Sequence, residues 1–211
     1  MEYVVFVILT YLFCCLNFSH IYLNKYKKDS ERAWTTHIGS SFIWKNHSRI
    51  ASIIIFLGDS ILKGFLPIFL AKMVFDFTNL HLLTNFNFGD ESYLILIVLF
   101  QVLGNNWSIF LKFKGGRGMA IVVGSLLGVH FVLASVLYAL YFIIYIKVKD
   151  GGPSWIISLG IATFISIFFS YSIFACYLIS LFLIILKRIT GNSISKDYRI
   201  IKNRLIFDRD E

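Results

Sequence analysis

Residues 113–118, Phe-Lys-Gly-Gly-Arg-Gly, form a short basic, glycine-rich segment between two long apolar stretches. Its three glycines allow the backbone to turn tightly and expose N–H groups, because glycine adopts positive φ at little steric cost. Successive exposed N–H groups form a concavity that binds anions. Lys114 and Arg117 add positive charge, for which phosphate is a natural partner. The segment predicts a phosphate-binding loop; the alternative is a tight turn whose charges orient the chain in a membrane.

Two opposite charges, Asp59 and Lys63, lie within another apolar stretch, four residues apart and hence on one helix face. Charges inside a membrane are costly and by default indicate a functional site. The alternative is a mutual ion pair that makes both charges tolerable while Gly58 and Gly64 pack against a neighbouring helix. In either case the pair predicts a polar interior beside the glycine-rich loop.

Three other parts of the sequence carry polar residues that could bind a ligand: segment 39–49, Ser158 and Asn192. Gly39-Ser40-Ser41 and Asn46-His47-Ser48-Arg49 are rich in hydrogen-bonding groups, and Arg49 lies where the chain re-enters the membrane. Its guanidinium can bind a phosphate, or it can reach lipid headgroups. Ser158 lies near the start of a predicted helix, where anions are favoured, but it also suits a small packing position. Asn192 follows the last apolar stretch and can also be an ordinary helix cap.

Apolar stretches recur along all 211 residues, which are 57% hydrophobic with a mean hydropathy of +0.74. This composition is typical of an integral membrane protein, and residues 1–211 are expected to form a single membrane-embedded domain. Because lipid requires backbone polar groups to pair within a segment, each stretch predicts a helix. The expected helices span residues 3–22, 50–75, 92–111, 119–147, 154–170 and 171–187.

The charges between these stretches predict their orientation. Segments 23–49 and 112–118 are basic and should be cytoplasmic, whereas segment 76–91 is acidic and should lie outside. A single crossing by 119–147, which is longer than an ordinary span of roughly 20 residues, would leave the basic C-terminal tail outside. Splitting the stretch into a membrane hairpin, with a break near His130, removes this conflict. We therefore expect an all-α integral membrane fold of about seven transmembrane or partial helices, N-terminus outside and C-terminus inside.

The formal net charge is +8, but Lys and Arg cluster between the spans, so the charge indicates membrane topology rather than nucleic-acid binding. Cys14, Cys15 and Cys176 lie in apolar stretches and are expected to be free thiols without a metal site. No Ser-His-Asp set, HExxH or Walker-type sequence is present, and no general base is obvious.

Two stretches resemble signatures of a known family. Residues 104–120 resemble Gly-His-x2-Pro-x-Phe-x2-Phe-Lys-Gly-Gly-Lys-Gly-Val-Ala, in register and without gaps. Residues 59–67 resemble the same family's Asp-x2-Lys-Gly-x2-Pro helix, with one extra residue.

Three further matches occur in the family's order. Gly39-Ser40 and Asn46-x-x-Arg49 resemble the ends of one signature. Ser158-Leu159-Gly160 resembles the next, and Lys187-Arg188 with Asn192 resembles the last. Over nearly its whole length, the chain thus resembles the bacterial acyl-phosphate:glycerol-3-phosphate acyltransferases, the PlsY family.

The resemblance implies an enzyme of the bacterial plasma membrane with its site at the cytoplasmic face. It would transfer a fatty acyl group from acyl-phosphate to the 1-hydroxyl of sn-glycerol-3-phosphate, giving lysophosphatidate and phosphate. This is the first step of phospholipid synthesis, and it needs no metal or organic cofactor in the family. An activated donor suits a site without an obvious base, where positioning and electrostatic stabilisation would supply the catalysis.

The resemblance also implies roles for individual residues. Ser40, Arg49 and Arg117 would be catalytic. The substrate-binding residues would be Asn46, Lys63, Lys114, Gly115, Gly116, Gly118, Ser158 and Asn192. The cations would bind two phosphorylated substrates, and the glycine-rich loop would hold phosphate through its N–H groups.

The chain departs from the family pattern at several signature positions. Asn105 and Ile189 stand where the family has His, Ser108 where it has Pro, and Arg117 where it has Lys. Phe42 and other bulky residues occupy the shortened first signature. Arg in place of Lys keeps the charge but changes the geometry.

These departures leave an alternative, a catalytically impaired or repurposed relative acting as a membrane binding module. Filling of the pocket by Phe42 and Trp44 would favour that alternative. A small transporter is a third possibility, indicated by Asp59 and Lys63 alone; it would need a midplane cavity between inverted repeats, and no repeat is present in the sequence.

Overall fold

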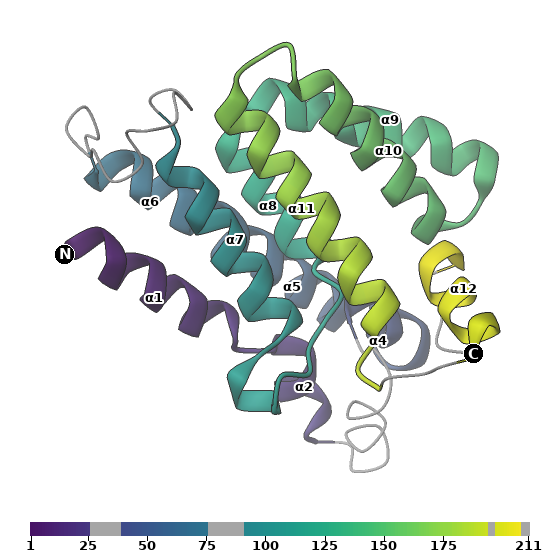
Figure 1. Ribbon diagram of the computed structural model, residues 1–211. Helices are drawn as coiled ribbons and strands as arrows, with labels where there is room; N and C mark the ends of the chain where they lie inside the picture. Colours follow the sequence, from purple (N-terminus) through teal and green to yellow (C-terminus); the bar gives the residue numbers. More distant parts are fainter. Residues whose placement is uncertain (26–38, 76–90, 194–196, 208–211) are drawn as a thin grey trace.

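The apolar stretches are helices in the computed structural model, which describes residues 1–25, 39–75, 91–193 and 197–207. Figure 1 shows these helices as one bundle, with α1 starting at one end and α12 at the other. The prediction of an all-α integral membrane fold is confirmed. Its sidedness stays a prediction, and residues 26–38 and 76–90 of the two segments 23–49 and 76–91, on which it partly rests, lie outside the described residues.

The first expected span consists of two helices, α1 (Glu2–Cys14) and α2 (Phe18–Leu23). The chain leaves helical geometry at Asn17, whose side-chain oxygen accepts the His20 N–H at 2.9 Å and caps α2. The break therefore places a polar cap within an apolar stretch.

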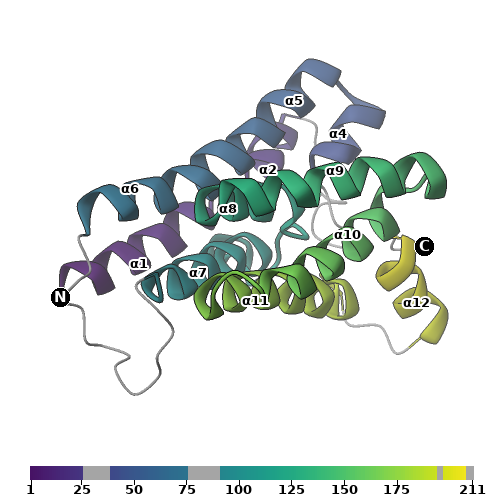
Figure 2. The same ribbon diagram turned by 90° about the horizontal axis from the view of Figure 1, so that it is seen from above.

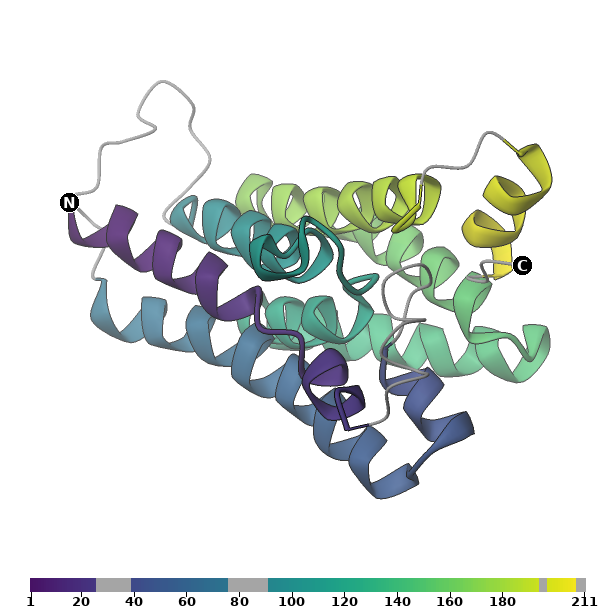
Figure 3. The same ribbon diagram turned by 90° about the horizontal axis from the view of Figure 1, so that it is seen from below.

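The second expected span is continuous but changes its helical geometry. After the short helix α4 (Ser40–Asn46), the span contains α5 (Arg49–Leu57), a π-helical segment η1 (Gly58–Phe65) and α6 (Leu66–Val74). Figures 2 and 3 show this span lying alongside α1 and α2. A π-helical stretch has i→i+5 hydrogen bonds in place of the usual i→i+4 bonds and often occurs at functional sites.

The third span, α7 (Tyr93–Asn106), ends five residues before the expected end at 111. Ser108 turns the chain here, since its N–H donates to the Lys114 carbonyl at 3.1 Å and its hydroxyl to the Cys15 carbonyl at 2.7 Å. A short 3₁₀ turn, η4 (Ile109–Leu111), leads into the glycine-rich loop. The apolar residues after Asn106 therefore belong to a turn rather than a helix.

The predicted break near His130 is confirmed. The chain forms α8 (Met119–Val129) and α9 (Phe131–Val148), and His130 between them is extended, with φ −149° and ψ 102°. Its Nδ1 accepts the Leu133 N–H at 3.2 Å and so caps α9. The Tyr138 hydroxyl donates to the Val123 carbonyl and ties the two helices together.

Three helices complete the described chain: α10 (Gly151–Ser166), α11 (Tyr171–Thr190) and α12 (Tyr198–Phe207). Asp150 accepts the Gly152 N–H at 3.0 Å, which explains why α10 begins earlier than expected. Four described helical spans are long enough to cross a membrane, and α7, α8 and α10 are shorter apolar helices. This pattern agrees with the expected mixture of full and partial spans.

The backbones of η1 and α8 touch near the centre of the bundle. A Cβ atom on Gly124 would lie 1.6 Å from the Ser60 carbonyl oxygen, and one on Gly64 would lie 2.5 Å from the Ile121 carbonyl oxygen. Small residues permit this close approach, which is a common way for helices to associate in membranes. The relative position of η1 and α8 is therefore set by backbone contact.

Substitution of Gly124 by Ala is expected to destabilise the fold by about 3 kcal/mol, because the added methyl group cannot fit against Ser60. Thermal unfolding of the purified protein in detergent would measure the effect. Gly160→Ala is the matched control, since no atom lies within 4 Å of its Cβ position. Equal unfolding temperatures for the two variants would contradict the tight contact.

Candidate functional site

The glycine-rich loop is held by hydrogen bonds on two sides. The Gly115 N–H donates to Asn192 Oδ1 at 3.1 Å, and Asn192 Nδ2 donates to the Gly115 carbonyl at 3.2 Å. On the other side, the Gly116 N–H donates to the Asn105 carbonyl at 3.0 Å. Lys187 Nζ donates to Asn192 Oδ1 at 3.0 Å and holds this amide in place. Two of the N–H groups expected to face phosphate therefore bind protein atoms instead.

Close packing explains why two loop positions are glycine. A Cβ on Gly115 would lie 2.3 Å from the Asn105 carbonyl oxygen. Gly118 has a φ of +77°, and its Cβ would lie 2.5 Å from Asn106 Oδ1. Because Gly118 ends the loop in this conformation, α8 begins immediately beside it and turns its N-terminal N–H groups toward the loop.

A cleft of about 160 Å³ opens beside the loop. Five parts of the chain meet there: the α1–α2 break, the start of α4, the α5–η1 junction, the end of α7, and the loop with the start of α8. The cleft is lined by Asn17, Ser19, Gly39, Ser40, Ser41, Phe56, Asp59, Asn105, Gly116, Arg117, Gly118, Met119 and Ala120. The N-terminus of α8 and the guanidinium of Arg117 favour an anion in this cleft.

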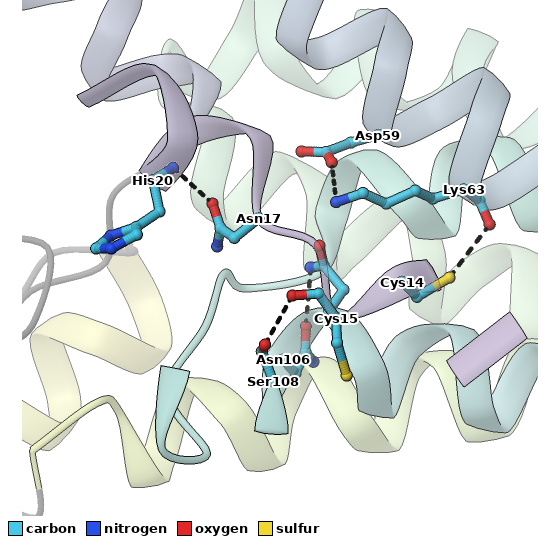
Figure 4. A network of polar contacts seen from close by, with 9 residues as sticks. Cys14, Cys15, Asn17, His20, Asp59, Lys63, Asn106 and Ser108 are labelled. Carbon is cyan, nitrogen blue, oxygen red and sulfur yellow. Dashed lines mark hydrogen bonds and ion pairs between the residues drawn. The ribbon is translucent and has the colours of Figure 1, made fainter. Parts of the chain in front are cut away.

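Asp59 and Lys63 form an ion pair, one of the two alternatives that the sequence left open, with 2.5 Å between Asp59 Oδ1 and Lys63 Nζ (Figure 4). Lys63 is fully buried, and its Nζ lies 4.3 Å from the centroid of the Phe18 ring. Gln101 donates to the carbonyls of Lys63 and Gly64, both at 2.8 Å. These bonds join α7 to the π-helical segment, inside the bundle where polar groups need protein partners.

The structure brings part of the predicted site together. Ser40, Gly116, Arg117 and Gly118 line the cleft. Lys63 lies behind Asp59, and Gly115 and Asn192 hold the loop from behind. Lys114 is half-buried in the turn, where its carbonyl accepts the Ser108 N–H.

Seven predicted site residues are absent from the cleft lining: Lys63, Lys114, Gly115 and Asn192, described above, and Arg49, Asn46 and Ser158. Arg49 is exposed, with its guanidinium carbon 5.6 Å from the centroid of the Trp44 ring. Asn46 is exposed and donates to the Phe42 carbonyl at 3.0 Å. Ser158 is fully buried and donates to the Trp155 carbonyl at 3.0 Å. Their roles in substrate binding or catalysis stay predictions.

Asn17, Asp59 and Asn105 line the cleft but were not among the predicted site residues. The charge of Asp59 within an apolar stretch was the available signal, because a charge inside a membrane by default indicates a functional site. Asn17 reaches the cleft because the first span breaks beside it.

Neither Phe42 nor Trp44 lines the cleft. Phe42 packs against a small cluster formed by Leu23, Ile43 and Ile55, and Trp44 is 47% exposed. Phe42 and Trp44 therefore do not fill the cleft, which was the condition that would have favoured a catalytically impaired relative. Among the described residues, no group of three or more His, Cys, Asp or Glu is arranged to hold a metal ion.

The fold and the cleft define a multi-pass α-helical membrane protein with a binding site suited to an anionic ligand. Residues 4–194 match the glycerol-3-phosphate acyltransferase family, so the chain belongs to that family. The family resemblance in the sequence is thereby confirmed.

Curated relatives carry the same family name. Glycerol-3-phosphate acyltransferase 1 of Bacillus cereus (strain ATCC 10987 / NRS 248) is 28% identical over 134 residues, which cover 64% of this chain and 66% of the relative. The glycerol-3-phosphate acyltransferase of Francisella philomiragia is 30% identical over 139 residues, covering 66% of this chain and 62% of the relative. The chain spans just under two thirds of the length of the relatives it matches first.

Solved structures show the same fold. The crystal structure of PlsY, an integral membrane glycerol 3-phosphate acyltransferase, in its glycerol 3-phosphate form matches with a TM-score of 0.74 at 21% identity. The match covers 89% of this chain and 88% of that chain. A second PlsY structure, in its lysophosphatidic acid form, matches with a TM-score of 0.73 at 19% identity.

Substitution of Asn192 by Leu is expected to loosen the loop, because it removes two hydrogen bonds to Gly115. At about 1 kcal/mol for each bond, amide exchange at Gly115 and Gly116 should accelerate by roughly tenfold or more. Hydrogen–deuterium exchange of peptides covering 112–118 would measure this. Thr190→Ala, which removes only a bond to the Leu186 carbonyl, should leave exchange in the loop unchanged. Unchanged exchange in Asn192→Leu would show that other contacts hold the loop.

Proposed function

We propose that this protein transfers a fatty acyl group from acyl-phosphate to the 1-hydroxyl of sn-glycerol-3-phosphate, releasing phosphate. The protein would act as a single membrane-embedded domain in the bacterial plasma membrane, with its cleft at the cytoplasmic face. The observation that carries the proposal is the meeting of Arg117, Ser40 and the N-terminus of α8 in one cleft of a glycerol-3-phosphate acyltransferase family member.

In the proposed reaction, Arg117 and the α8 N-terminus hold a phosphate group by charge-assisted hydrogen bonds. The acceptor hydroxyl oxygen forms an ester bond with the acyl carbon while the bond from that carbon to the phosphate oxygen breaks. A substrate phosphate takes the hydroxyl proton, which fits a site whose chemistry is positioning and electrostatics. Arg117 also stabilises the negative charge that develops on the acyl oxygen.

The remaining predicted residues would act at the margin of this cleft. Arg49 would supply a second cation after its guanidinium moves from the Trp44 ring. Lys114 would add positive potential from the loop, and Asn46 and Ser158 would contact ligand only after a rearrangement. The acyl chain would follow the lipid-facing apolar surface that continues from Phe56.

Binding of a phosphorylated lipid precursor without turnover is the second candidate. It is favoured by the inward hydrogen bonds of the Gly115 and Gly116 amides and by the position of Ser158 away from the cleft. An assay for turnover distinguishes the two candidates directly.

Phosphate release from palmitoyl-phosphate by purified protein in lipidic mesophase tests the proposal. We expect release that requires glycerol-3-phosphate. Arg117→Ala should lower kcat/KM by about 100-fold or more, because a charge-stabilising donor in the cleft is lost. Lys112→Ala is the matched control: this exposed lysine lies in the same turn but outside the cleft lining, and activity should stay within about twofold.

Absence of acceptor-dependent release from folded protein would overturn the transferase proposal. Binding of glycerol-3-phosphate by that same inactive protein would favour the second candidate. An equal loss of activity in Arg117→Ala and Lys112→Ala would mean that Arg117 acts only through the overall charge of the loop.

A further inference from the structure

Asp59 is the one carboxylate among the described residues that line the cleft. Its Oδ1 faces Lys63, and Figure 4 shows its other oxygen directed away from that lysine. The Asp59 side chain is 16% exposed, whereas the Lys63 side chain is 0% exposed. The ion pair therefore presents a hydrogen-bond acceptor to the cleft and keeps its ammonium group inside the protein.

The burial of Lys63 fixes the orientation of this pair. Its ammonium group lies against the Phe18 ring, and its backbone carbonyl accepts from Gln101 and from the Cys14 thiol, the latter at 3.6 Å. Lys63 Nζ contacts Asp59 Oδ1, and the other Asp59 oxygen, which Figure 4 shows directed away from Lys63, is left to the cleft. Because the pair carries no net charge, Arg117 and the α8 N-terminus still favour an anion nearby.

An ionised carboxylate accepts hydrogen bonds and repels phosphate oxygens, so it suits a hydroxyl group of a ligand. Stabilisation of the fold does not explain why a buried ion pair is present here, because the free-energy cost of removing two charges from water roughly cancels their attraction. A ligand with phosphate at one end and hydroxyl at the other matches the combination of Arg117 and Asp59 in the same cleft.

We propose that Asp59 binds a hydroxyl group of the phosphorylated acceptor and that Lys63 is its positioning residue. The cleft would thereby select a polyol phosphate over a phosphate ester of similar size that has no hydroxyl. The identity of the acceptor rests on the proposed function, whereas the selectivity for hydroxyl groups rests on the ion pair and its position in the cleft.

Calorimetric titration with glycerol-3-phosphate and with n-propyl phosphate, which lacks hydroxyl groups, tests this selectivity without requiring turnover. In Asp59→Asn, Lys63 should hold the amide oxygen and leave the NH₂ group facing the cleft, so that a neutral donor replaces the charged acceptor and the hydrogen bond to the hydroxyl group weakens. We expect the Kd for glycerol-3-phosphate to rise by about tenfold or more. The Kd for n-propyl phosphate should not rise.

The double variant Asp59→Leu/Lys63→Met keeps the approximate shape of the pair and removes both charges, which guards against loss of folding. It should bind glycerol-3-phosphate as weakly as Asp59→Asn while keeping the unfolding temperature of the unaltered protein. Glu91→Leu/Lys72→Met is the matched control, since Lys72 and Glu91 form another ion pair, at 3.4 Å, outside the cleft lining. That control should change neither Kd.

An equal rise of both dissociation constants would overturn the inference, because the pair would then act on phosphate or on the fold. An unchanged Kd for glycerol-3-phosphate would also overturn it. Selective weakening of glycerol-3-phosphate binding in a protein that shows no phosphate release would support the inference and overturn the transferase proposal alone.

Discussion

The backbone contact between η1 and α8 is the constraint on which the rest of the site depends. Gly64 and Gly124 let the two elements approach until their main chains touch. Asp59 belongs to η1 and Arg117 lies just before α8, so this contact sets the positions of two charges of opposite sign in the cleft. Such an approach leaves no space for a side chain, and a single methyl group would separate the walls of the cleft.

Gln101 connects this contact to the third helix, α7. It donates to the carbonyls of Lys63 and Gly64 in η1 and accepts from Ser125 on α8 at 2.8 Å. The end of α7 then supplies the Asn105 carbonyl that holds Gly116. In lipid, where water cannot satisfy backbone groups, one polar side chain thus couples three apolar helices to the loop.

Much of the fold could be predicted because lipid imposes local rules. Apolar length predicted the spans, and the balance of charges between them predicted the break at His130. The same rules predicted a helix to residue 111, whereas α7 ends at Asn106. Ile109–Leu111 is apolar enough for a helix, but the bonds of Ser108 to the Lys114 and Cys15 carbonyls turn the chain. The Lys114 carbonyl belongs to the loop, and the Cys15 carbonyl is distant in sequence, so the apolar periodicity of the sequence does not reveal either bond.

The sequence by itself determined the membrane class, the family resemblance and the glycine positions of the loop, because each depends on composition or on near neighbours. It placed Asp59 and Lys63 on one helix face, and the structure showed that they pair. The tertiary structure decided which side chains share the cleft. It added Asn17 and Asn105, placed Ser158 elsewhere, and turned two glycine amides toward Asn192 and Asn105. Helix breaks and backbone contacts between distant segments decide which side chains and amide groups face the cleft. The spacing of residues along the sequence does not specify those contacts.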